Sequence, residues 1–247
     1  MLARTSSFAG PISQAPNRYV VTRGLRLFLD AGDSRSYSGT GTAWNDISGN
    51  GVNFTLRGGT GTASYAASNG GILVFNSGSY HFADTASNLG DLNQFTVESW
   101  VRWDGNPAAG TNAVVTNIYD GVSKVNFVLG ACEPLSATVR AGFYNGAWRN
   151  VATGHTPTLN TWYHYAGTYN GSTVTLYVNT ATTYTLSYSG TPQSGGAIRI
   201  ARRWDDVANV STNFTHGAIP VVRIYNRALS VAELNQNFNA QRSRYGV

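Results

Sequence analysis

The sequence has few cysteines and few charged residues. Cys132 is its single cysteine, so the chain cannot form an intrachain disulfide or a metal site built from several thiolates. Only 12% of its 247 residues are charged, whereas 42% are hydrophobic, so we expect its stability to come from packing. Glycine, serine, threonine and asparagine recur between short apolar runs, a texture typical of many strands joined by turns.

Long hydrophobic runs are also absent. No segment reaches the length of a membrane span, so we expect no membrane insertion. The first 24 residues contain no continuous apolar stretch such as a signal peptide has, and we expect no conventional export signal there.

Positive charge is present but scattered. The 17 basic residues include only one lysine, Lys124, and against 12 acidic residues they give a net charge of +5. Nucleic-acid-binding surfaces gather such residues on one face or helix, so the scattering argues against a nucleic-acid partner. The flat guanidinium of arginine suits protein interfaces better than the ammonium of lysine, which favours protein contacts for these side chains.

Residues 1–23 show neither a helical nor a strand period. Alone, such a segment would be disordered, because a terminus without core contacts has nothing to offset its conformational entropy. We predict that residues 1–23 form an extended arm that a partner protein holds, with docking contacts from Arg4, Arg18 and Arg23. The alternative is that the arm folds back along its own domain.

The end of the chain combines a strand with the start of a helix. Residues 218–225 alternate as a strand half buried against a core. Ser230 and Glu233 have the spacing of a capping box, which predicts a short helix after this strand. We expect that helix to bury Val231, Leu234 and Phe238.

Two Asn-Gly dipeptides, at 145–146 and 170–171, predict β-hairpins because each is flanked by strand-like runs. Residues 95–103 carry apolar side chains on both faces, which is typical of a strand buried between two layers. Further strands are expected near residues 25–29, 71–76, 80–82, 113–119, 125–130 and 197–202.

Several segments carry a more specific signal: Gly24 to Gly32, the turn WNDISGNG at 44–51, FTVESWV at 95–101, the hairpin at 162–179, and the stretch 214–234. In this order they closely resemble laminin G-like domains of the concanavalin A-like jelly-roll superfamily, and among these the versions found in virion structural proteins of tailed phages. The resemblance covers about residues 24–247. It implies an all-β, two-layer antiparallel jelly-roll sandwich with an extended N-terminal arm (1–23) and a short C-terminal helix.

The resemblance also implies a function. It favours a non-enzymatic structural protein at the virion surface, a capsid decoration or fibre subunit, docked on other virion proteins through its arm. A glycan-binding adhesin or lectin is the alternative, and one surface sandwich can serve both roles. A homo-oligomer is compatible with either function.

A glycoside hydrolase has the least support, because hydrolysis needs two carboxylates facing one scissile bond. Glucanases of this fold carry them in a Glu-x-Asp-x-x-Glu pattern, which is absent here, so we assign no catalytic residue. Glu98 stands alone in its strand, and we expect it to pair with an arginine or a backbone donor. His164, inside another strand, is expected to be a packing residue rather than a metal ligand.

Aromatic side chains beside loops are the candidate glycan-binding residues. Tyr144 and Trp148 flank the Asn145-Gly146 turn, and a later loop contains Arg203, Trp204 and Asp205. Aromatic faces stack on sugar rings, and planar polar groups beside them form hydrogen bonds. Burial in the core is the alternative at each aromatic position.

One loop offers a candidate calcium site. Asp46 and Asn50, in the glycine-containing turn, present the hard oxygen ligands that calcium prefers. The alternative for Asp46 is an Asx turn to its own loop backbone. No other cofactor is expected.

Overall fold

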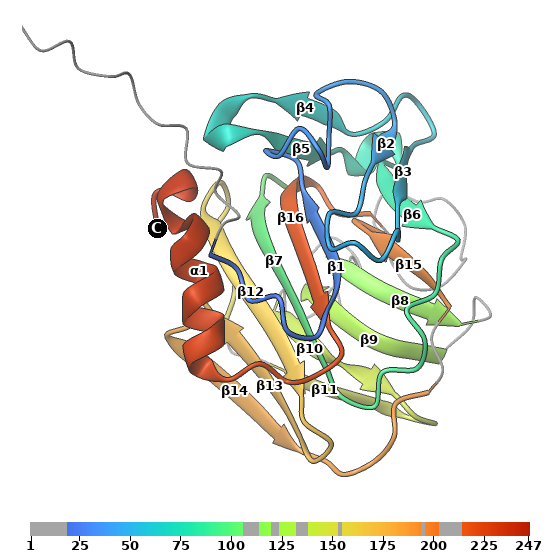
Figure 1. The fold of residues 1–247 in the computed structure, drawn as a ribbon, viewed down its shortest axis with the longest axis vertical. Helices are drawn as coiled ribbons and strands as arrows, with labels where there is room; N and C mark the ends of the chain where they lie inside the picture. Colours follow the sequence, from blue (N-terminus) through green and yellow to red (C-terminus); the bar gives the residue numbers. More distant parts are fainter. Residues whose placement is uncertain are drawn as a thin grey trace, which may run out of the picture.

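The computed structural model describes residues 19–105, 114–119, 124–131, 138–152, 155–193, 196–202 and 214–247. In this part of the chain, two eight-stranded antiparallel sheets pack face to face, and a long C-terminal helix lies on the outside of one of them (Figure 1). The predicted all-β, two-layer sandwich is thus confirmed.

The first sheet has the strand order β14-β13-β12-β7-β16-β5-β4, and β1 also pairs with β16. Its strands are β1 (Leu25–Asp30), β4 (Ser64–Ala66), β5 (Ile72–Phe75), β7 (Phe95–Trp103), β12 (Trp162–Tyr169), β13 (Thr173–Val178), β14 (Thr182–Ser187) and β16 (Gly217–Tyr225).

The second sheet has the order β11-β10-β9-β8-β15-β6-β3-β2. Its strands are β2 (Ala43–Trp44), β3 (Phe54–Arg57), β6 (Phe82–Thr85), β8 (Val115–Tyr119), β9 (Lys124–Ala131), β10 (Val139–Tyr144), β11 (Trp148–Ala152) and β15 (Ala197–Ile200). Two short 3₁₀ turns, η1 (Ser68–Gly70) and η2 (Ser77–Ser79), flank β5.

Both predicted Asn-Gly hairpins are confirmed. β10 pairs with β11 and β12 with β13, and the glycines of the turns, Gly146 and Gly171, have φ values of 93° and 97° that favour glycine. The strand expected at 80–82 starts later, at Phe82. Tyr80 instead ends η2 in the left-handed region, with φ 56°, and this conformation cannot continue a strand.

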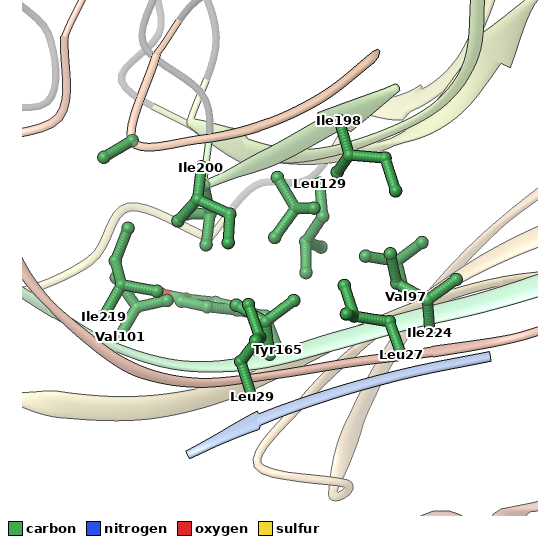
Figure 2. Close-up of a cluster of buried hydrophobic side chains, with 14 of the residues drawn as sticks. Leu27, Leu29, Val97, Val101, Leu129, Tyr165, Ile198, Ile200, Ile219 and Ile224 are labelled. Atoms are coloured by element: carbon green, nitrogen blue, oxygen red, sulfur yellow. The ribbon is translucent and has the colours of Figure 1, made fainter. Parts of the chain in front are cut away.

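The main core fills the space between the two sheets. Figure 2 shows side chains of the first sheet facing those of the second, all of them fully buried. Leu27, Leu29, Val97, Val101, Tyr165, Ile219 and Ile224 come from the first sheet, and Leu129, Ile198 and Ile200 from the second. Burial of apolar surface between the layers is the main term that stabilises such a fold.

β16 is buried at every residue, not half buried as the alternation predicted. It lies inside the first sheet, between β7 on one side and β5 and β1 on the other. Its outer face is covered as well, since Ala218 and Val221 pack in a second apolar cluster with Phe238 of the helix. The pairing with β7 shifts register between Ala218 and Val221, where Pro220 has no N–H to donate to a ladder.

The helix α1 (Val231–Tyr245) has 15 residues and is longer than predicted. Its predicted capping box of Ser230 and Glu233 is present. Leu234 and Phe238 are buried as expected, whereas Val231 is 49% exposed. The buried stripe of α1 starts with Leu234, one turn after Val231, which explains the wrong prediction for Val231.

Residues 19–23, the described part of the predicted arm, pack on this helix and on the first sheet. Val20 and Val21 are 8% and 7% exposed. The N–H of Val21 donates to Asn237 Oδ1 at 2.7 Å, and its carbonyl accepts the Tyr225 hydroxyl at 3.0 Å. Among the described residues, the packed part of the chain therefore includes Val20 and Val21, before the predicted boundary at residue 24.

The predicted docking residues of the arm are placed only in part. Arg4 and Arg18 lie outside the described residues. Arg23 is exposed, and its carbonyl accepts a hydrogen bond from Arg227 Nε at 3.0 Å. Within the described ranges, no helix is long and apolar enough to cross a membrane.

Candidate functional site

Three loops meet at one end of the sandwich, toward the lower edge of Figure 1: the β10–β11 turn, the segment after β14, and the segment before β7. Asn126, fully buried in β9, ties the last two together. Its amide donates to the carbonyl of Gln193 at 2.8 Å and to that of Leu92 at 3.4 Å. The N–H of Gln193 in turn donates to the Tyr144 carbonyl. We call residues 88–94, 144–149 and 188–193 the loop end.

The predicted aromatic residues Tyr144 and Trp148 form a pair at the loop end. They lie directly opposite each other across the β10–β11 hairpin. Their ring centroids are 5.4 Å apart in an edge-to-face arrangement, which is a favourable geometry for aromatic rings. Trp148 is 36% exposed and Tyr144 is half-buried, so the pair lies at the surface rather than in the core.

A cluster of planar polar groups lies at the same turn but on the other face of the hairpin, because Arg149 pairs with the buried Phe143 and side chains alternate along a strand. The guanidinium carbon of Arg149 lies 4.0 Å from the ring centroid of Tyr188, and Arg149 Nε donates to Asn145 Oδ1 at 3.2 Å. The Asn145 amide donates to the Tyr188 hydroxyl at 2.6 Å. These contacts hold three hydrogen-bonding side chains in one arrangement, on the face of the hairpin that does not carry Trp148.

The sequence did not reveal Arg149 and Tyr188 as site residues. Arg149 directly follows Trp148, so its position next to a candidate residue was a usable signal. Tyr188 directly follows β14, far from the turn along the chain, and no local pattern connects it to Asn145. The Tyr169 hydroxyl lies 3.3 Å from the Tyr188 carbonyl oxygen and forms hydrogen bonds with the backbone of Gly190, which fixes the chain around Tyr188.

The other predicted glycan-binding residues, Arg203, Trp204 and Asp205, lie outside the described residues. The structure therefore does not place them relative to the loop end, and their role stays a prediction.

Asp46, the predicted calcium ligand, is engaged by its own loop. Its two carboxylate oxygens accept hydrogen bonds from the N–H groups of Phe28, Ser48 and Val52 and from the Ser48 hydroxyl, at 2.8 to 3.2 Å. The Asn50 amide also donates to the Ser48 hydroxyl. These contacts fit the alternative of an Asx turn, and calcium at Asp46 and Asn50 stays a prediction. Among the described residues, no group of three or more His, Cys, Asp or Glu is arranged to hold a metal ion.

Glu98 is buried beneath α1. Its Oε1 accepts hydrogen bonds from Arg223 Nε and, at 2.8 Å, from the Asn237 amide, while His164 Nε2 lies 3.4 Å from Oε2. Burial alone would raise the pKa of the Glu98 carboxyl, but Arg223 and His164 together hold that pKa below its usual value. Glu98 pairs with an arginine, as expected from its isolation, and His164 packs against the ring of Trp100.

A second ion pair extends this buried network. Arg244 of α1 donates to both carboxylate oxygens of Asp30, at 2.9 and 3.0 Å. Gln241, also on α1, donates to Asp30 and accepts a hydrogen bond from Arg223, so it joins the two ion pairs. The negative charges of two carboxylates are thus balanced by the positive charges of two guanidinium groups between the helix and the sheet. This arrangement holds α1 in place and leaves neither carboxylate open to a substrate.

The architecture is that of a lectin-like sandwich, and sequence comparison identifies the same class. A family model described as the concanavalin A-like lectin/glucanases superfamily matches residues 75–235, more than half of the chain, so the protein belongs to this family. No curated protein matches the sequence.

Solved structures with the same fold come from several organisms. Domain 4 of AbnA, an extracellular arabinanase of Geobacillus stearothermophilus in complex with arabinotriose, is 18% identical with a TM-score of 0.63, over 88% of this chain and 98% of that one. The binding domain of botulinum neurotoxin DC in complex with SialylT is 13% identical with a TM-score of 0.63, over 90% and 52% of the two chains. Trypanosoma rangeli sialidase is 18% identical with a TM-score of 0.62, over 91% and 34%. At these identities the likeness shows a shared fold, and the chain spans about half of the toxin domain and a third of the sialidase.

Proposed function

We propose that this protein is a non-enzymatic glycan-binding domain that binds sugars at its loop end. The observation that carries the proposal is the surface pair of Tyr144 and Trp148 on the outward face of the β10–β11 hairpin. An exposed aromatic face covers the apolar C–H surface of a sugar, while the fixed groups of Arg149 and Tyr188 lie at the same turn on its other face. Binding sites commonly combine aromatic lining with a few convergent polar groups.

The similar structures support this ligand class. The AbnA domain was solved with an arabinose oligomer, and the toxin binding domain with SialylT. The absence of catalysis is part of the proposal and is supported by the engagement of two carboxylates. Glu98 is buried against Arg223, and Glu233 belongs to the capping box of α1.

A glycan array followed by calorimetry on the best ligand tests the proposal. We expect Trp148→Ala to weaken binding at least about tenfold, which corresponds to about 1.4 kcal/mol of lost contact. Tyr65→Ala is the matched control, because Tyr65 is 38% exposed, close to the 36% of Trp148, and lies on β4, away from the loop end (Figure 1). The proposal fails if the protein binds no glycan or if both variants bind equally.

The virion role belongs to the same proposal. We infer that the protein is displayed on a virion surface, as a capsid decoration or fibre subunit, and docks on other virion proteins through its N-terminal arm. The resemblance of its sequence to virion proteins of tailed phages supports this context. A homo-oligomer is compatible with it.

Deletion of residues 1–18 tests this docking and leaves residues 19–23 on the domain, where they pack on α1. We expect the truncated protein to fold with an unchanged unfolding midpoint and to be lost from the parent particle. Incorporation at the level of the full chain would contradict docking by the arm. Removal of residues 1–23 is a poorer test, because it also breaks the contacts of Val21 with Asn237 and Tyr225.

A further inference from the structure

A hollow lies at the loop end, on the side of β1 and β16, and it involves neither Tyr144 nor Trp148. Its volume is about 380 Å³, within the range of small-molecule binding sites. Leu89 and Leu92 form its apolar lining, and the remaining lining side chains are polar: Arg26, Asp91, Asn93, Gln94 and Asn226.

The loop that forms one wall of this hollow is held in shape by the core. Leu89 and Leu92 are 4% and 5% exposed and belong to the main core between the sheets. The N–H of Gly90 donates to the Asn88 side chain at 2.8 Å, and the Leu92 carbonyl accepts the amide of Asn126. A loop anchored in this way loses little conformational entropy when a ligand binds.

Because Leu89 and Leu92 are fixed in the core, the polar side chains between and after them point to solvent. Asp91, Asn93 and Gln94 are exposed, because they alternate with or follow the buried leucines. Asn226 is exposed at the end of β16, where its backbone N–H is bonded to the Gly24 carbonyl. The side chains of Asn93, Gln94 and Asn226 therefore supply amide donors and acceptors at the rim.

Arg26 forms the cationic part of the lining. It is half-buried, and its Nη2 makes one long hydrogen bond of 3.4 Å to the Leu89 carbonyl. Its Nε is buried and finds no hydrogen-bond acceptor among the described residues. The guanidinium therefore has donor capacity that its protein neighbours do not use.

The lining defines the chemical class of the ligand. The charge of Arg26 is balanced by that of Asp91, so the hollow as a whole favours neither an anion nor a cation. Amide, carboxylate and guanidinium groups are planar and form paired hydrogen bonds to neighbouring hydroxyls, whereas the lining contains no aromatic ring for stacking. A neutral, hydroxyl-rich ligand held by its edge matches these groups.

We propose that this hollow is a second saccharide-binding site, which takes one neutral sugar unit by hydrogen bonds to Arg26, Asn93, Gln94 and Asn226. The choice of a sugar rests on the proposed function, but the site shares no residue with the Trp148 site. Either site can therefore fail without the other.

Titration of the isotopically labelled full chain with neutral hexoses and pentoses, followed by NMR, tests the proposal. We expect saturable shifts of the side-chain amide signals of Asn93, Gln94 and Asn226, and these shifts persist in Trp148→Ala. The double variant Asn93→Ala/Gln94→Ala should weaken this binding at least about tenfold while it leaves the Trp148-dependent glycan affinity unchanged. Because both substituted positions are exposed, we expect the double variant to fold normally, and an unchanged unfolding midpoint checks this.

Glucuronate and glucosamine serve as charged comparisons in the same titration. Absence of amide shifts with every neutral sugar overturns the second site, even if Trp148-dependent glycan binding is intact. Tighter binding of either charged sugar than of its neutral counterpart overturns the assignment of a neutral ligand. Loss of Trp148-dependent binding alone contradicts the proposed function and leaves the second site standing.

Discussion

The face beneath α1 and the loop end use the same kinds of side chain for different purposes. Beneath α1, Arg223 and Glu98 have side chains no more than 1% exposed, and Trp100 is fully buried against Phe238 and Tyr245. At the loop end, an arginine and aromatic rings also meet, but Trp148 is 36% exposed. The two regions differ because α1 covers the first. The helix packs on Trp100 and forms hydrogen bonds with the Glu98–Arg223 pair, whereas Trp148 at the loop end is partly exposed to solvent. Aromatic and arginine residues thus stabilise the first region and are available to a ligand in the second.

The largest effect is expected from breaking the buried ion pair. Glu98→Ala leaves the Arg223 guanidinium buried without its counter-charge, and should lower the free energy of unfolding by about 3–5 kcal/mol. Asp84→Ala is the matched control, since the side chains of the Arg57–Asp84 pair are 54% and 26% exposed, and it should cost no more than about 1 kcal/mol. Urea denaturation of both variants measures the contrast, and equal losses would show that burial of the pair does not matter.

The apolar contact of α1 should come next. Leu234→Ala removes a fully buried side chain and should cost about 2–5 kcal/mol. Val231→Ala, one turn earlier and 49% exposed, should change stability by no more than about 0.5 kcal/mol. A large loss for Val231→Ala in the same denaturation assay would restore the sequence-based expectation that Val231 is buried.

A smaller, pH-dependent effect is expected at the start of α1. The hydrogen bonds from Arg227, and those from Ser230, lower the pKa of Glu233 to about 2. Because the pKa is lower in the folded than in the unfolded state, where it is about 4.5, this stabilisation is present above about pH 4.5 and is lost as the pH falls toward 2. The unfolding midpoint of Glu233→Gln should therefore lie below that of the unmodified protein at pH 6 and approach it near pH 2. A difference that did not change with pH would exclude the charge of Glu233 as its cause.

The smallest effect on stability is expected at the loop end. Trp148→Ala should lower the free energy of unfolding by less than about 1 kcal/mol, since the ring is partly exposed and contacts the half-buried ring of Tyr144. Thermal unfolding measures this, alongside the loss of glycan affinity. A loss as large as that of Leu234→Ala would mean that Trp148 serves the fold and not a ligand.

The candidate site could be predicted only in part. Tyr144 and Trp148 were identifiable because a hairpin turn places its flanking residues at a sheet end. The Arg149–Tyr188 contact and the hollow beside Arg26 could not be predicted, since each joins segments far apart in the chain. The sequence identified Asp46 as a loop residue whose oxygens could bind calcium. Only the structure shows the N–H groups that donate hydrogen bonds to its carboxylate.

Short sequence patterns were enough to predict the two Asn-Gly hairpins and the capping box of Ser230 and Glu233. Backbone sterics and hydrogen bonds between residues close in sequence determine such features. The order of strand-like segments, together with the resemblance to a known family, was sufficient for the two-sheet sandwich. Which surfaces remain exposed was decided by tertiary packing. α1 and residues 19–23 cover the outer face of the first sheet, so that β16 is buried on both sides and Glu98 needs a buried partner. Trp148 stays 36% exposed, and this partial exposure depends on where distant segments pack rather than on its neighbours in the sequence.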